Sequence, residues 1–500
     1  VYFITLGGFW HLFLCGIALN KDTLLSHSNK ALRSDALDII ESGMTACDPY
    51  ENTRKLLQLE SGKLTVGGKQ FEADGDPDTG ATDYDVTSFQ HIYVVGAGKG
   101  VQLVVKAIED VLGDYLTGGE IICKHGDPML VKKVHVTMGS HPTPDHGCVE
   151  GCQRILNLSS RITENDLVFT VIMNGGSSLL TCPADGITLE DTIEVTRLMQ
   201  IELGVTTRKL NALRNHIDKL KGGKLLRLFS RATLINLCGA DLNRAFDIGK
   251  TDFQYLVKEN YWLHNVPDGT TYEGALQTIK EFNVEERIPA SVMRLLRSQS
   301  PENASLKYEE YRNFKSRIFG VMPEADGFFH AAMHRAKELG YTPYFMSDGF
   351  NIEASHVGAF IGLMAECISR RGQAMKLPAA LIFTGEMIVT VGESENVGGR
   401  NQEAALSCAK WIADKPGIVY AGVDTDGTDG PGGFIAEDAP RCLAGAIVDG
   451  NTKRELKEKG FELEECVLTH NTSAPLWKTN NGIFARQGVS LNDLVVVLLQ

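Results

Sequence analysis

The sequence has no excess of basic residues, no Cys-x-x-Cys pair, and neither an internal repeat nor a low-complexity tract. Its 49 Lys and Arg residues stand against 63 Asp and Glu residues, and this net charge of −14 excludes the broadly basic surface with which proteins bind nucleic acids or anionic membranes. The 11 cysteines are scattered and odd in number, which argues against a disulfide framework or a zinc site and indicates reduced, mostly buried thiols. We therefore expect small-molecule partners, no nucleic acid, no membrane and a cytoplasmic location, with homo-oligomerisation left open.

The first 20 residues differ from the rest of the chain, because they are apolar, rich in aromatic side chains and without Lys or Arg. Three interpretations stay open: a secretory or mitochondrial targeting signal, a non-native leader, or a short buried segment. A signal peptide needs a basic region before its apolar stretch, and none is present here. We treat residues 1–28 as a leader of uncertain role and place no site in them.

Short apolar runs alternate with helical windows along the first two thirds of the chain, which predicts βαβ units and a largely parallel sheet. The expected strands are at residues 91–95, 120–123, 133–138, 166–173, 232–237 and 343–346, and the expected helices at 29–50, 101–112, 147–157, 325–340 and 353–371. Residues 62–88 and 243–320 are polar and rich in turn residues, so we expect a loop or irregular hairpin in the first segment and irregular structure in the second.

The texture of the sequence changes near Leu377-Pro378, and this change predicts a domain boundary. The fold class is therefore α/β with two domains. Residues 29–376 are expected to form an N-terminal Rossmann-like parallel sheet with helices on both faces, and residues 377–500 a smaller C-terminal α/β domain.

The string VVGAGKG follows an expected strand and precedes an expected helix, with Gly96, Gly98 and Gly100 around Lys99. Glycines allow a phosphate to approach the backbone closely, and the helix N-terminus and the lysine supply N–H donors and positive charge. The spacing is not that of a Walker A loop, and it is only a partial dinucleotide fingerprint because Val101 stands where the third glycine should be. The alternative is a tight turn with a solvent-exposed lysine.

A second turn with Gly175, Gly176 and Ser177 follows the run at 166–173. Two such turns at the carboxyl ends of neighbouring parallel strands would open onto one crevice, where open α/β sheets bind ligands. Downstream, Arg214 and Lys221 are seven residues apart, so on a continuous helix they would share a face suited to a dianion. The alternative is a solvated basic face.

The densest cluster of polar residues lies in the C-terminal part. The alternation in MIVTV predicts a strand directly after Glu386, and Arg400 and Asn401 stand at a glycine-rich helix start, where an arginine suits a phosphoryl oxygen. The run DTDGTDG contains Asp426 and Asp429 and follows another apolar stretch. Its spacing is not that of an EF-hand, so Mg²⁺ or hydroxyl contacts are the better interpretation.

Several of these strings occur in the order typical of the class II glycerate kinase family, whose C-terminal part is called the MOFRL domain. The resemblance covers about residues 30–499 and rests on VGAGKG, SHPTPD, GGSSLL, NALRNHIDKLKGG, FTGEMIVTV, GGRNQEAALS, DTDGTDGPGG and NDLVVVLL. It implies phosphorylation of D-glycerate at its 2-hydroxyl to 2-phosphoglycerate, with ATP and Mg²⁺ as cofactors. The family also implies that the lysine of the first string and the arginine of GGRNQE are central, here Lys99 and Arg400.

From this resemblance and the physics of phosphoryl transfer we predict a role for each candidate. Lys99 and Arg400 would stabilise charge in the transition state, Arg214 would bind the glycerate carboxylate, and Asp426 or Asp429 would bind Mg²⁺. Substrate or phosphate contacts are expected from the remaining binding residues, namely Gly98, Gly175, Gly176, Ser177, Lys221, Glu386 and Asn401.

The chain departs from the family pattern at Leu237, where an aspartate is expected beside the reacting hydroxyl. Asp241 lies nearby and is the remaining catalytic candidate. If the lost carboxylate acts as a general base, its absence would cost on the order of 10² to 10⁴ in rate. Two alternatives therefore stay open: a catalytically impaired relative that only binds a nucleotide or metabolite, and an NAD(P)-dependent hydroxypyruvate reductase.

Overall fold

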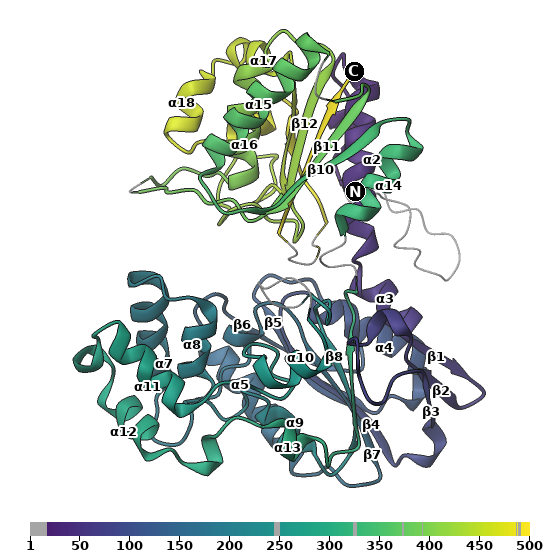
Figure 1. Cartoon of the computed structure of the whole chain (residues 1–500), viewed down its shortest axis with the longest axis vertical. Helices are drawn as coiled ribbons and strands as arrows, with labels where there is room; N and C mark the ends of the chain where they lie inside the picture. Colours follow the sequence, from purple (N-terminus) through teal and green to yellow (C-terminus); the bar gives the residue numbers. More distant parts are fainter. Residues whose placement is uncertain are drawn as a thin grey trace. The chain divides into compact units, whose positions relative to one another are not determined.

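The computed structural model describes residues 18–244, 251–323, 328–372, 375–392, 394–486, 488 and 492–500. The chain forms two compact units, each built around its own sheet (Figure 1). We call Asp48–Asp326 the parallel-sheet unit, and Val1–Cys47 together with Gly327–Gln500 the mixed-sheet unit. No described helix combines the length and apolarity needed to cross a membrane.

The parallel-sheet unit contains six parallel strands in the order β6-β5-β4-β7-β8-β9. Their bounds are β4 His91–Ala97, β5 Gly118–Lys124, β6 His135–Gly139, β7 Asp166–Ile172, β8 Thr233–Cys238 and β9 Ser316–Gly320. Counted along the sheet, this is the doubly wound order 3-2-1-4-5-6, so the direction of winding reverses between β4 and β7. The predicted Rossmann-like sheet is confirmed, and the reversal marks the edge at which ligands bind in such folds.

Helices cover this sheet because its strands are apolar on both faces. Alternate strand residues such as Ala97, Ile122 and Cys238 share one core with α5 (His146–Ser159) and α9 (Lys224–Phe229). Outside that core, α4 (Val101–Leu112) packs on β4, β5 and β7. The other helices of this layer are α3 Pro49–Leu56, α6 Gly176–Leu179, α7 Leu189–Thr196 and α8 Thr207–Arg214.

Two segments are more regular than the sequence predicts. Residues 57–85 form a three-stranded antiparallel sheet of β1 Leu57–Glu60, β2 Lys63–Val66 and β3 Thr82–Asp85. The segment expected to be irregular carries four helices, α10 Phe253–Glu259, α11 Tyr272–Glu281, α12 Ala290–Ser298 and α13 Tyr308–Tyr311. Helices α11 and α12 are stable because they bury apolar residues such as Ile279 and Leu296 in a separate core with α7 and α8.

The mixed-sheet unit has six strands in the order β10-β11-β15-β12-β13-β14, of which only β10 and β11 are parallel. Their bounds are β10 Thr342–Phe350, β11 Ala379–Gly385, β12 Ile418–Asp424, β13 Gly445–Asp449, β14 Gly482–Ile483 and β15 Asp493–Leu499. The predicted strand MIVTV is wrong: within the described residues 387–391 only Ile388 makes a bridge, to Glu353. The strand lies just before it, at β11.

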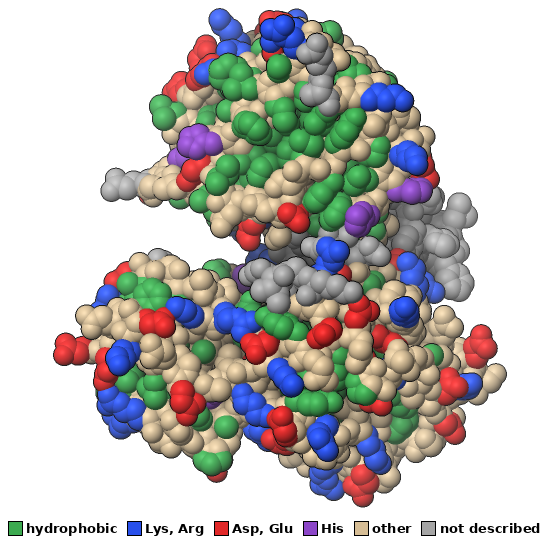
Figure 2. Space-filling model, viewed as in Figure 1, with side chains coloured by type: hydrophobic (Ala, Val, Ile, Leu, Met, Phe, Trp, Pro, Cys, Tyr) green, Lys and Arg blue, Asp and Glu red, His purple; other side chains and the backbone are tan. Residues whose placement is uncertain are grey.

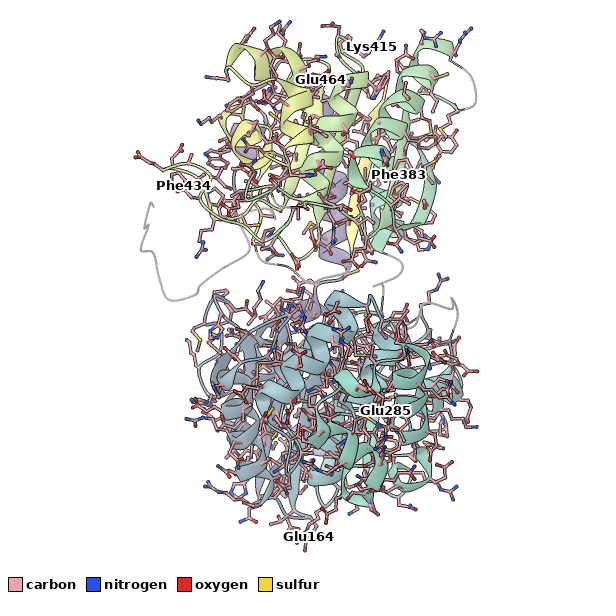
Figure 3. The ribbon with its side chains drawn as sticks, turned by 90° about the vertical axis from the view of Figure 1, so that its left-hand side faces the viewer. Glu164, Glu285, Phe383, Lys415, Phe434 and Glu464 are labelled. Atoms are coloured by element: carbon pink, nitrogen blue, oxygen red, sulfur yellow. The ribbon has the colours of Figure 1, made fainter. Side chains whose placement is uncertain are left out.

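Both faces of this sheet are covered by helices. One core contains α15 Ala354–Arg371, α16 Arg400–Trp411, α17 Thr452–Glu458, α18 Leu463–Leu468 and α19 Ser473–Lys478. Phe383 of β11 belongs to this core and lies inside the unit, whereas Lys415 and Glu464 lie at its surface (Figure 3). The opposite face packs on α1 Lys21–Leu24, α2 Lys30–Ala46 and α14 Phe328–Glu338.

The compact units therefore have other bounds than the predicted division at residue 376. Helix α2 packs with the C-terminal strands, and a buried ion pair of 2.9 Å joins Arg33 of α2 to Asp449 of β13. The expected leader also takes part in this unit from Ala18 onward, because Ala18 bridges to Ala485 and Leu24 is fully buried. The rest of the expected leader, residues 1–17, lies outside the described residues.

The visible surfaces of the two units differ in character. Figure 2 shows apolar side chains gathered on one face of the mixed-sheet unit. On the visible face of the parallel-sheet unit, acidic and basic side chains are interspersed. This mixture agrees with the acidic net charge, which predicts no broad basic surface.

Candidate active site

Lys99 lies in a glycine-rich turn that joins the end of β4 to the start of α4. Gly98 has a φ of 138° and Gly100 a φ of 76°, values that favour glycine. A Cβ atom on Gly98 would lie 2.6 Å from the carbonyl oxygen of Met173, so any side chain there would collide with the chain after β7. The N–H of Lys99 donates to the carbonyl of Asn174 at 2.7 Å. The backbone of the turn is thereby fixed against the end of β7.

The glycine turn after β7 lies beside the turn that contains Lys99. A Cβ atom on Gly175 would lie 3.0 Å from Cδ2 of His141 and 3.3 Å from Cγ of Lys99. The two turns thus lie together at the switch point, as the strand pattern predicts. The N–H of Gly176 donates to the carbonyl of Met173 at 3.0 Å, so it is already used within the turn and does not fit the predicted contact with a phosphate.

Ser177 follows this turn and is held by two buried side chains. Its Oγ lies 3.0 Å from Nε2 of His264 and 3.2 Å from Nδ2 of Asn211, which donates to it. Both His264 and Asn211 are completely buried, whereas Ser177 is partly exposed. The structure therefore adds two polar residues to the predicted site around Ser177.

Arg214 lies one turn beyond Asn211, at the end of α8. Its guanidinium donates to Oγ1 of Thr196 at 3.2 Å and to Oε1 of Gln200 at 3.1 Å, and in the described part of the chain no carboxylate pairs with it. Only 6% of Arg214 is exposed, and burial lowers its pKa to about 10. A buried cation with neutral partners is suited to receive an anion.

Lys221 does not share a helix with Arg214, so the predicted common face is wrong. Helix α8 ends at Arg214, and a turn through Gly222 and Gly223, both with positive φ, separates it from α9. The Nζ of Lys221 lies 2.8 Å from Oδ2 of Asp218, and both side chains are 1% exposed. Its charge is therefore balanced inside the protein, and the predicted contact of Lys221 with substrate does not fit this geometry.

Position 237 is also buried rather than open to a ligand. Leu237 lies within β8, is completely buried and pairs with Val171 and Phe319 on the neighbouring strands. This burial contradicts the expectation that position 237 lies beside the reacting hydroxyl. Asp241, the other candidate, follows β8 at its carboxyl end, is partly exposed and accepts a hydrogen bond from the N–H of Asn243 at 2.9 Å.

In the mixed-sheet unit Arg400 is surrounded by acidic residues. It is the first residue of α16, and its Nε donates to Asp493 at 2.8 Å, its Nη1 to Glu386 at 3.0 Å and its Nη2 to Asp424 at 2.9 Å. These bonds join the helix to the ends of three strands. An arginine has five N–H donors, so two remain for a further acceptor.

Burial and charge act against each other in this cluster. Burial raises the pKa of Asp424 to about 8 and that of Asp493 to about 6, although Arg400 lowers both. Burial also acts to lower the pKa of Arg400, but the nearby carboxylates outweigh it and raise the pKa of Arg400 overall. A single guanidinium does not fully neutralise two buried carboxylates, so the pair retains a proton more readily than exposed aspartates do.

Asp429 and Asn401 hold the start of α16 rather than face a ligand. The carboxylate of Asp429 accepts from the N–H groups of Asn401 at 3.1 Å and of Gln402 at 2.9 Å, and 1% of Asp429 is exposed. The side chain of Asn401 is completely buried and donates to Asp493 at 2.7 Å. The predicted roles of Asp429 as a metal ligand and of Asn401 as a substrate contact do not fit these bonds.

Asp426 keeps the position expected of a metal ligand better than Asp429 does. It is partly exposed, and one of its oxygens, Oδ1, accepts from the N–H of Thr428 at 2.8 Å. The described residues contain no group of three His, Cys, Asp or Glu side chains arranged to hold a metal ion. Mg²⁺ commonly binds through one or two carboxylates together with phosphate oxygens and water, so Asp426 alone is compatible with a metal that arrives with a nucleotide.

Five polar residues beside the candidates were not predicted: Asn211, His264 and His141 in the parallel-sheet unit, and Asp424 and Asp493 at Arg400 in the mixed-sheet unit. Two of them stand in strings that carry the resemblance, Asp424 in DTDGTDGPGG and Asp493 in NDLVVVLL. His141 stands in the quoted string SHPTPD. Asn211 is the first residue of the string NALRNHIDKLKGG, whereas His264 stands in none of these strings, and only the fold brings both residues to Ser177.

Two family models match this chain. One is described as Domain of unknown function (DUF4147) and matches residues 35–245, and the other is the MOFRL family and matches residues 379–494. The predicted glycine turns of the parallel-sheet unit fall in the first match. Arg400 and the acidic residues up to Asp493 fall in the second.

Relatives extend the match to nearly the whole chain. Glycerate 2-kinase of Pyrococcus horikoshii is 31% identical over 94% of this chain and 97% of its own length, and D-glycerate 2-kinase of Thermotoga maritima is 29% identical over 82% and 91%. A crystal structure of a Pyrococcus horikoshii protein, 29% identical, aligns with a TM-score of 0.68 over 94% of this chain and 98% of that chain. This chain belongs to the class II glycerate kinase family.

Proposed function

We propose that this protein transfers the γ-phosphoryl group of ATP to the 2-hydroxyl of D-glycerate. The observation that carries the proposal is the position of Lys99, within one glycine turn and against a second at the switch point of a doubly wound sheet. Such an edge receives phosphates and other anions, because backbone N–H groups, a helix start and a cation converge on it. The resemblance to named glycerate 2-kinases supplies the substrate and the acceptor hydroxyl.

Phosphoryl transfer requires positioning and charge neutralisation more than covalent chemistry by the protein. We assign Lys99 to the phosphoryl oxygens, and Arg400 to the same role through the two N–H donors that its carboxylates leave over. Arg214 would bind the carboxylate of glycerate, since it is buried without an acidic partner in the described chain. Asp241 remains the proposed acceptor of the hydroxyl proton.

Mg²⁺ is proposed to accompany ATP, and of the two predicted ligands only Asp426 fits. Bound Mg²⁺ would neutralise charge on the phosphates. Gly98 and Gly175 are proposed to matter through their shape, because a side chain at either position would fill the space at the edge of the sheet or collide with the facing turn.

A dinucleotide-dependent reductase is not favoured by this geometry. Val101 fills the position of the third glycine of the fingerprint and is completely buried. The strand next to β4, β5, ends at Lys124, whereas NAD-binding folds place an acidic residue near that strand end to bind the ribose.

The direct test is product formation by the purified chain with ATP, Mg²⁺ and D-glycerate. We expect glycerate-dependent release of ADP, and a ³¹P NMR spectrum of the product that matches 2-phosphoglycerate. The 3-phosphoglycerate spectrum would correct the acceptor hydroxyl. Binding of ATP without glycerate-dependent turnover would instead identify a relative that only binds its ligands, and oxidation of NADH by hydroxypyruvate would identify a reductase.

A further inference from the structure

The hydroxyl of Ser177 is surrounded by donors. Its oxygen lies 3.0 Å from Nε2 of His264 and accepts a hydrogen bond from Nδ2 of Asn211 at 3.2 Å. The direction of the first bond depends on which ring nitrogen of His264 carries the hydrogen, and the surroundings of the ring decide this.

The other ring nitrogen of His264 faces a backbone donor. The N–H of Gly222 points to Nδ1 at 3.4 Å, and a backbone N–H can only donate. The ring is completely buried, and burial together with Lys221, Lys224 and Arg214 holds its pKa well below the usual value, so the ring is neutral. Nδ1 is therefore the acceptor, and the hydrogen is on Nε2, which donates to Ser177.

This tautomer excludes one familiar role for a serine beside a histidine. A histidine that activates a serine nucleophile must take the hydroxyl proton on the nitrogen that faces the serine. Nε2 of His264 already carries a hydrogen, so it cannot take that proton in this arrangement. The pair is built to orient the serine rather than to activate it.

The two incoming bonds occupy both lone pairs of the Ser177 oxygen. Its own hydrogen finds no acceptor within the described part of the chain. Ser177 is partly exposed, and it is two residues from Gly175, whose turn touches Lys99. Arg214 lies three residues after Asn211 on α8, so one face of that helix presents the serine's partner and a buried cation together.

We propose that His264 and Asn211 are positioning residues that fix the Ser177 hydroxyl as a donor to an anionic oxygen of a ligand at the Lys99 turn. This inference rests on the proposed function and adds a specificity-determining contact to it. Two ligand groups share the required chemistry: the carboxylate of the hydroxy acid and a phosphoryl oxygen of the nucleotide. Kinetics with each ligand varied in turn distinguishes them.

The kinetic test uses Ser177→Ala, His264→Leu, the double variant that combines these two changes, and His264→Gln as the control. The glutamine amide keeps an N–H donor near the position of Nε2. We expect Ser177→Ala and His264→Leu each to raise KM at least about tenfold, as expected for losing a hydrogen bond to a charged group. A rise in the KM for glycerate identifies the carboxylate, and a rise in the KM for ATP identifies the phosphoryl oxygen. The double variant should be no worse than the worse single variant, and His264→Gln should stay within about threefold of wild type.

Independent effects of the two single variants, or a normal KM in a folded His264→Leu variant, would overturn the proposal. If His264→Leu is unstable, His264→Gln and Ser177→Ala still decide it, because a near-normal KM in Ser177→Ala or a tenfold rise of KM in a folded His264→Gln variant would overturn the proposal.

A spectroscopic test does not depend on turnover. In protein labelled with ¹⁵N in histidine, long-range ¹H–¹⁵N correlation should show His264 as the neutral Nε2–H tautomer between pH 6 and 8, with the His264→Gln variant giving the assignment. The Nδ1–H tautomer or a protonated ring would contradict the inference. Inactivity toward glycerate would reject the proposed function and leave this spectroscopic result to judge His264 separately.

Discussion

The two units each place a cation between a glycine-rich segment and a helix. In each, a glycine-rich segment follows the sheet and brings a cation to the start of a helix, Lys99 before α4 and Arg400 at α16. Lys99 lies beside a second glycine turn and His141, and Ser177, which follows that turn, is contacted by His264 and Asn211. Arg400 instead donates to three carboxylates. Arg400 thus holds its own unit together, whereas the role proposed for Lys99 concerns a ligand.

The largest expected effect is that of Arg400→Ala, which should damage both activity and fold. Removing the guanidinium leaves Asp424 and Asp493 buried without their cation, a type of change that costs about 3 kcal/mol or more. We expect kcat/KM to fall at least about 10²-fold and the free energy of unfolding, measured with urea, to fall by that amount. An unchanged unfolding midpoint would show that the two sites do not differ as described.

Lys99→Ala should damage activity alone, and Lys99→Arg is its matched control. The turn is fixed by the backbone N–H of Lys99 and by its glycines, so the free energy of unfolding should change by no more than about 0.5 kcal/mol. We expect kcat/KM to fall at least about 10²-fold, with partial activity retained in Lys99→Arg. A stability loss comparable to that of Arg400→Ala would remove the contrast between the two units.

Arg214→Met and Lys221→Met sharpen the contrast within the parallel-sheet unit. Arg214 has no acidic partner in the described chain, so its replacement should raise the KM for glycerate at least about tenfold and leave the KM for ATP nearly unchanged. Lys221→Met should instead lower stability by about 3 kcal/mol, because Asp218 would stay buried and unpaired. Equal effects of Arg214→Met on both KM values would contradict its role in binding the carboxylate.

An effect that is absent at neutral pH is a pH dependence of stability in the parallel-sheet unit. Burial lowers the pKa of His216 from 6.5 to about 4, so between these values the unfolded chain binds more protons than the folded one. Stability from this group is therefore complete above pH 6.5 and is lost as the pH falls towards 4, by up to about 3 kcal/mol. His264 acts in the same direction. His216→Gln should reduce the fall in Tm between pH 7 and pH 5, and an identical fall would contradict this account.

The sequence predicts five of the six strands of the parallel sheet, because strands such as β4 and β7 are continuous apolar runs between turn residues. It misses β9, which lies in the segment expected to be irregular. It also predicts both glycine turns, since each follows such a run directly. It fails where regular structure depends on distant packing: α11 and α12 lie in a polar stretch and are held by a core with α7 and α8. Alternation misleads at MIVTV, which has a strand-like pattern but no neighbouring strand to pair with along its length.

The same distinction, between local pattern and distant packing, applies to the residues of the candidate site. Lys99, Ser177 and Arg400 stand in motifs, so their types and spacing predict them. The pairing of Arg214 with Lys221 assumed a continuous helix, but α8 ends at Arg214, and Asp218, between the two residues, bridges to Pro183. His264 has no motif at all, because its role depends on a backbone N–H and a hydroxyl supplied by segments far away in the sequence.

The most direct test of the account compares wild type with Lys99→Ala in one ³¹P NMR experiment with ATP, Mg²⁺ and D-glycerate. We predict that the wild-type spectrum gains the signal of 2-phosphoglycerate as the γ-phosphate signal of ATP declines. At equal protein concentration and time, Lys99→Ala should give about 1% of that product or less. Product from both proteins at similar rates would contradict the role of the Lys99 turn, and no product from folded wild type would contradict the proposed function itself.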